Sequence, residues 1–152
     1  MNEKVVMGIR ILFGVFCLVF GLNKFLGFIP FPPIEGDGGT LMGIYATSGF
    51  FKLIGILEIV FGLGLIINKY VPLSLTILIA IMFNALIFHA LHDMAGIGGA
   101  VLGLILGLVF VFANKDRFKE LLSAYLNNIM KIFKPHFGTE MWFFISKNNE
   151  AF

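Results

Sequence analysis

The chain has 152 residues, of which 59% are hydrophobic and only 13% are charged, and its formal net charge is +2. A soluble domain usually carries about 25% charged residues, so this composition predicts an integral membrane protein. The small net charge argues against nucleic acid as a partner. The single cysteine, Cys17, excludes an intrachain disulfide or a CxxC redox pair.

Four apolar segments are each close to the roughly 20 residues that a helix needs to cross the hydrocarbon core. They are residues 5–28, 41–67, 71–91 and 97–113. The links at 68–70 and 92–96 are so short that the segments they join must run antiparallel. We therefore predict an all-α membrane protein, in which residues 1–113 form an antiparallel bundle of four transmembrane helices.

Between the first two spans, residues 28–40 contain three prolines and three glycines, which disfavour a regular helix. We expect an irregular loop there, lying against the outer membrane interface. After the last span, residues 114–134 place apolar side chains at helical spacing between lysines, which predicts an amphipathic helix on the cytoplasmic face of the bilayer. Residues 135–152 are expected to form a short irregular tail.

Basic residues predict the orientation of the spans. They cluster at one set of span ends, whereas the opposite loops contain Glu35, Asp37 and Asp93 and no lysine or arginine. The positive-inside rule then places both termini in the cytoplasm. The basic residues that decide this are Lys4, Lys69, Lys115, Arg117 and Lys119.

Glycines recur on one face of three of the predicted spans, where they allow close approach of a neighbouring backbone. They are Gly14 and Gly21, then Gly55 and Gly62, and finally Gly99, Gly103 and Gly107. Such faces serve either the packing of the bundle or a homodimer. The sequence alone leaves both uses open.

Charged residues inside a span are costly, so each is expected to have a partner or a function. Glu58 shares a helix face with Gly55 and Gly62, which should turn it into the bundle. Arg10 of the first span is the cation that we expect to reach it, in a structural ion pair. Lys24 lies near the outer edge and is expected to extend its ammonium group to the headgroups.

A second group of polar residues suggests a pocket open toward the outer side. Lys52, Asn84 and His89 are expected at similar depths, and with Glu58 they are our candidate ligand-binding residues. The alternative is that these residues only fix the register of the helices. His92 is expected at the membrane interface, and His89 and His92 with a nearby carboxylate do not make a closed set of metal ligands. We predict no metal site and assign no catalytic residue.

The segments "RILFGVFCLVFGLNKF" and "GILEIVFGLGLI", with a third span that ends in histidine, resemble the DoxX-like family of small bacterial membrane proteins. The resemblance covers residues 7–113, and the positions that carry it include Arg10, Lys24 and Glu58. It implies a four-helix bundle in the bacterial inner membrane, with a connection to quinone or redox chemistry. It does not imply that the chain is an enzyme.

Three functions are compatible with these features. The first is a redox-associated subunit that binds a quinone in the polar pocket, where Lys52, Asn84 and His89 donate hydrogen bonds and Glu58 accepts a proton. The second is a structural or assembly subunit of a membrane complex. The third is a small proton-linked carrier. The expected partners are the lipid bilayer, a redox protein and a second copy bound through the glycine faces.

Overall fold

The computed structural model describes residues 2–115 and 118. These residues belong almost entirely to the first of two units, Met1–Asn114, and this unit alone is described below. The predicted amphipathic helix 114–134 and the tail 135–152 lie outside the described residues, apart from residues 114, 115 and 118. They remain predictions.

The unit is all-helical over its described residues. Its elements are α1 (Glu3–Leu26), α2 (Gly36–Thr47), α3 (Phe50–Ile66), α4 (Val71–His92), the short 3-10 helix η1 (Met94–Gly96) and α5 (Ile97–Ala113). Three stretches are long and apolar enough to cross a membrane: α1, α4, and η1 together with α5. A fourth span results if α2 and α3 count as one broken span. The chain is a small multi-pass membrane protein.

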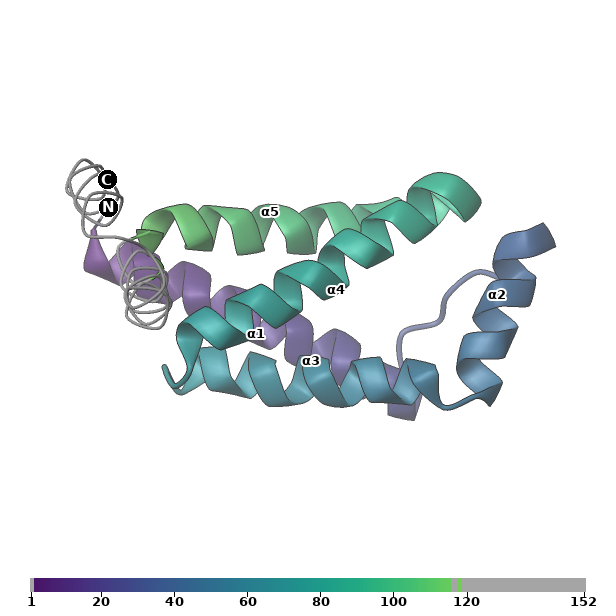
Figure 1. Cartoon of the computed structure of the whole chain (residues 1–152), viewed down its shortest axis with the longest axis horizontal. Helices are drawn as coiled ribbons and strands as arrows, with labels where there is room; N and C mark the ends of the chain where they lie inside the picture. Colours follow the sequence, from purple (N-terminus) through teal and green to yellow (C-terminus); the bar gives the residue numbers. More distant parts are fainter. Residues whose placement is uncertain (1, 116–117, 119–152) are drawn as a thin grey trace, which may run out of the picture. The chain divides into compact units, whose positions relative to one another are not determined.

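Four helices, α1, α3, α4 and α5, run side by side, and α2 lies across one end of them (Figure 1). Among these four, α1 packs on α3, α3 on α4 and α4 on α5. Because α5 also packs on α1, the four helices close into a ring. We call the end of the bundle that carries α2 the α2 end. There α1 and α4 finish, and α3 and α5 begin.

Local signals explain where α1 begins and ends. The side chain of Asn2 accepts a hydrogen bond from the backbone N–H of Lys4 at 3.0 Å, which caps the first turn. Gly27 adopts a left-handed conformation with φ 63°, which ends the helix. Just before this turn, the buried amide of Asn23 bonds both the N–H and the carbonyl of Ile29. The amide therefore fixes the path of the chain as it leaves α1.

The predicted second span, 41–67, is wrong as a single helix, because α2 and α3 are bent by 73° relative to each other. The break lies at Ser48 and Gly49, where Gly49 takes a left-handed φ of 78°. The hydroxyl groups of Thr47 and Ser48 also donate to nearby backbone carbonyls, as these residues often do at helix ends. The expected irregular loop 28–40 is likewise corrected, since α2 already begins at Gly36.

The glycine faces are used within the bundle. A Cβ atom added at Gly14 would lie 2.8 Å from the carbonyl oxygen of Gly62, and one added at Gly21 would lie 2.9 Å from that of Gly55. These two pairs are seven residues apart on both helices, so they define one antiparallel register of α1 against α3. Because the backbones already touch at these glycines, the glycine faces of α1 and α3 are occupied within the bundle and are not free to form a homodimer.

The other side of α1 packs against α5. Its phenylalanine rings lie over the glycines of α5, with Phe20 near Gly99, Phe16 near Gly103 and Phe13 near Gly107. The α4 helix contacts the same glycine face through Met82 and Ile79, and it contacts Gly64 of α3 through Ser74. Small residues thus occupy each of these close helix contacts.

Candidate functional site

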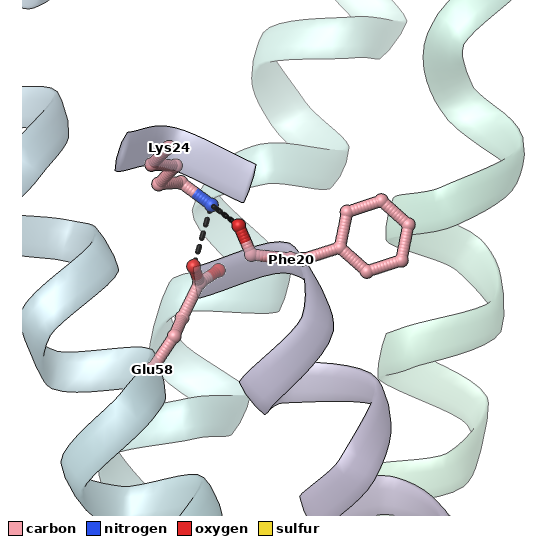
Figure 2. A network of polar contacts seen from close by, with 3 residues as sticks. All are labelled: Phe20, Lys24 and Glu58. Carbon is pink, nitrogen blue, oxygen red and sulfur yellow. Dashed lines mark hydrogen bonds and ion pairs between the residues drawn. The ribbon is translucent and has the colours of Figure 1, made fainter. Parts of the chain in front are cut away.

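A buried ion pair joins α1 to α3 near the α2 end. The Nζ atom of Lys24 lies 2.5 Å from Oε2 of Glu58, and the two side chains are 12% and 3% exposed. The same ammonium group donates to the carbonyl oxygen of Phe20 at 3.5 Å. Figure 2 shows both contacts, with the ring of Phe20 directed away from the pair. The ammonium also lies 5.2 Å from the centre of the Phe51 ring, in a cation–π contact.

The direction of helical side chains explains why these two residues meet. Side chains on a helix slope toward its N-terminus, so Lys24 extends back along α1 toward Phe20. Glu58 slopes toward the beginning of α3, which is the α2 end. A Cβ added at Gly21 would lie 3.0 Å from the Cβ of Glu58, so the two backbones are close at this level. Lys24 and Glu58 therefore slope toward each other from adjacent helices.

The predicted pair of Arg10 with Glu58 is wrong. Glu58 lies level with Gly21, and Arg10 precedes Gly21 by eleven residues, which is about 16 Å along the helix axis. The side chain of Arg10 also slopes toward the start of α1, away from Glu58. One of its guanidinium nitrogens, Nη1, is buried and has no hydrogen-bond partner among the described residues. The true partner of Glu58 is Lys24, which the sequence had led us to expect at the lipid headgroups.

The four residues that we expected around one ligand are not gathered in the structure. Lys52 and Asn84 are exposed on the outside of the bundle, and neither makes a hydrogen bond or ion pair with the described residues. Lys52 belongs to the first turn of α3, because that helix begins only at Phe50. Lys24, and not Lys52, is the lysine that forms an ion pair with Glu58.

A second polar pair lies at the end of α4. The Nδ1 atom of His89 lies 2.9 Å from Oδ2 of Asp93, one helical turn later, and both side chains are partly buried. His92 is exposed, and the ring of Phe88 is 5.4 Å from that of His89 and 5.6 Å from that of His92. A Cβ added at Gly38 would lie 2.7 Å from the Cβ of His92, which places α2 directly against the end of α4.

Among the described residues, no group of three or more His, Cys, Asp and Glu side chains is placed to hold a metal ion. Cys17 is a free thiol and is completely buried. The two ion pairs found among the described residues, Lys24 with Glu58 and His89 with Asp93, both lie toward the α2 end.

No family model, no curated protein and no solved structure matches the chain. Over the residues that the structure describes, the chain has the features of a small all-helical protein with three to four candidate membrane spans.

Proposed function

We propose that this multi-pass membrane protein is a redox-associated subunit that binds a quinone beside the Lys24 and Glu58 pair. The observation that carries the proposal is this pair itself, an ammonium and a carboxylate buried between two apolar helices. Ionisable residues at membrane depth are expensive, and functional sites are the usual reason for them. In this proposal the Lys24 and Glu58 pair replaces the larger set of candidate ligand-binding residues that included Lys52 and Asn84.

The ammonium of Lys24 has the donor that a quinone carbonyl needs. A lysine has three N–H donors, and the contacts to Glu58 and Phe20 use two of them. The third is left for a carbonyl oxygen. The Phe51 ring beside the ammonium offers a flat apolar surface for a quinone ring, and Glu58, which contacts the same ammonium, is a proton acceptor.

The resemblance to the DoxX-like family supports the same reading, because Lys24 and Glu58 both lie in the segments that carry it. Under this proposal the protein is in a bacterial inner membrane, with both termini in the cytoplasm and the α2 end on the outer side. The contact between His89 and Asp93 would then lie at the outer end of α4. A redox partner protein would supply or remove the electrons.

A structural or assembly subunit is the second candidate, and one observation favours it. The ion pair lies where the glycines Gly21 and Gly55 bring α1 and α3 together, so it also fixes the register of the two helices. In that case the charges serve packing and no small molecule binds to them.

The experiment that tests the first proposal measures quinone bound to the purified protein. The full chain is extracted in mild detergent, and quinone and phospholipid are quantified by mass spectrometry per mole of protein. We compare the unchanged protein with Lys24→Met and Glu58→Gln. Lys52→Ala is the matched control, since it removes an exposed lysine from the same end of the bundle.

We expect about one quinone per chain in the unchanged protein and in Lys52→Ala, and a loss of at least tenfold in Lys24→Met. Each variant is compared only if its helix content by circular dichroism equals that of the unchanged protein. Quinone that follows the phospholipid content, or that is retained by Lys24→Met, would overturn the proposal. The structural candidate would then be preferred.

A further inference from the structure

One face of α4 is turned away from the rest of the bundle. The side chains that pack against α3 and α5 lie on the opposite face and include Ser74, Leu78 and Met82. The exposed face follows a repeat of three and four residues, which is the spacing of a helix that pairs with another helix. Its exposed residues are Leu73, Thr76, Ala80, Phe83, Asn84, Ile87, Ala90 and Leu91.

Asn84 is out of place on this face. It is exposed, and its amide makes no hydrogen bond with the described residues. It lies 13 residues after Val71 and eight residues before His92, about 20 Å and 12 Å from the two ends of α4. These distances place it inside the hydrocarbon core, where water cannot satisfy an amide. Thr76, by contrast, donates its hydroxyl to the carbonyl of Pro72 and needs no further partner.

We propose that this face of α4 binds the same face of a second copy of the chain, with the two Asn84 side chains hydrogen-bonded to each other across a two-fold axis. An amide has both donors and an acceptor, so two identical copies satisfy each other without any other residue. Polar side chains of this kind hold transmembrane helices together. A contact in which each copy uses the same patch is the usual form of a symmetric dimer.

The neighbours of Asn84 fit a close helix contact. Ala80 lies one turn before it on the same face, and its small side chain lets a second backbone approach. Large apolar side chains lie toward both ends of the face, where Leu73 is 52% and Leu91 is 72% exposed. The glycine faces do not compete for this role, because they are filled inside the bundle.

The test uses disulfide cross-linking of the full chain in phospholipid vesicles. Cys17 is first replaced by alanine, and a new cysteine is placed at Ala80→Cys, one turn from Asn84. The control is Val109→Cys on the exposed surface of α5. Residues 80 and 109 are each twelve residues from the α2-end limit of their helix, so both cysteines lie at a similar depth. Each is tested with Asn84 intact, with Asn84→Leu and with Asn84→Gln.

We expect oxidised Ala80→Cys to form a covalent dimer and Val109→Cys to remain monomeric at the same ratio of protein to lipid. Asn84→Leu should weaken dimerisation about tenfold, measured by energy transfer between labelled chains on dilution with lipid. Asn84→Gln, which keeps an amide, should retain most of it. Equal dimerisation of Asn84→Leu and the unchanged protein, or a monomer at every dilution, would overturn the proposal. So would cross-linking of both cysteines alike.

Discussion

Lys24 and Glu58 meet because their side chains slope toward each other from antiparallel helices, and the contact is 2.5 Å long. Glu58 is almost fully buried, so removing its partner leaves a charge without compensation. We expect Lys24→Met to lower the free energy of unfolding by about 3 kcal/mol. The double variant Lys24→Met, Glu58→Leu should recover at least half of this loss. The measurement is reversible unfolding in mixed detergent micelles, and strictly additive losses would contradict the pairing.

Arg10 and Glu58 should behave as independent residues. They are separated by about 16 Å along the bundle, and effects of distant substitutions usually add within about 0.5 kcal/mol. A double-mutant cycle with Arg10→Ala and Glu58→Ala should therefore show no coupling above that limit. The same unfolding measurement serves here. A coupling of 1 kcal/mol or more would mean that Arg10 reaches Glu58 after all.

Gly14 is expected to be intolerant of any side chain. A Cβ at this position would lie 2.8 Å from the carbonyl oxygen of Gly62 and from a side-chain carbon of Ile66. We expect Gly14→Ala to destabilise the protein by about 1–3 kcal/mol, since the helices must move apart. Gly8→Ala is the control, because no described residue lies within 4 Å of a Cβ added there. If both variants unfold at the same detergent fraction, α1 and α3 do not pack through their glycines.

Gly49 should be required for the bend between α2 and α3. Its φ of 78° is unfavourable for any residue with a side chain, so Gly49→Ala should cost about 1 kcal/mol of stability. Gly43→Ala, inside α2 with no described residue within 4 Å of the added Cβ, should be neutral or stabilising. Thermal unfolding followed by circular dichroism distinguishes the two. A stabilised Gly49→Ala would indicate that residues 36–66 prefer one continuous helix.

The bundle follows from the sequence in part. Long apolar segments between short polar links predict the helices α1, α4 and α5, and these are present. Hydropathy does not predict the bend at Gly49, because it measures how apolar a segment is and not whether its backbone changes direction. The only local signal was the succession of Thr47, Ser48 and Gly49, whose residue types favour helix ends over helix interiors.

The candidate site depends on how neighbouring helices are aligned along one another. An apolar sequence specifies this alignment only weakly. Depth counted along a straight second span places Lys52 only just beyond the middle of the membrane, whereas the bend leaves it in the first turn of α3 and exposed. The partner of Glu58 could have been found from the glycines, because matching seven-residue spacings imply how α1 lies against α3. The slope of helical side chains would then have favoured Lys24 over Arg10.

The packing of α1 on α5 has a consequence for how the protein is made. The chain is synthesised from its N-terminus, so Phe13, Phe16 and Phe20 enter the membrane long before the glycines of α5 that they cover. Until then α1 can pair only with α3, through Gly14 and Gly21. The bundle is therefore assembled as an open row of helices, and insertion of α5 is the step that closes it.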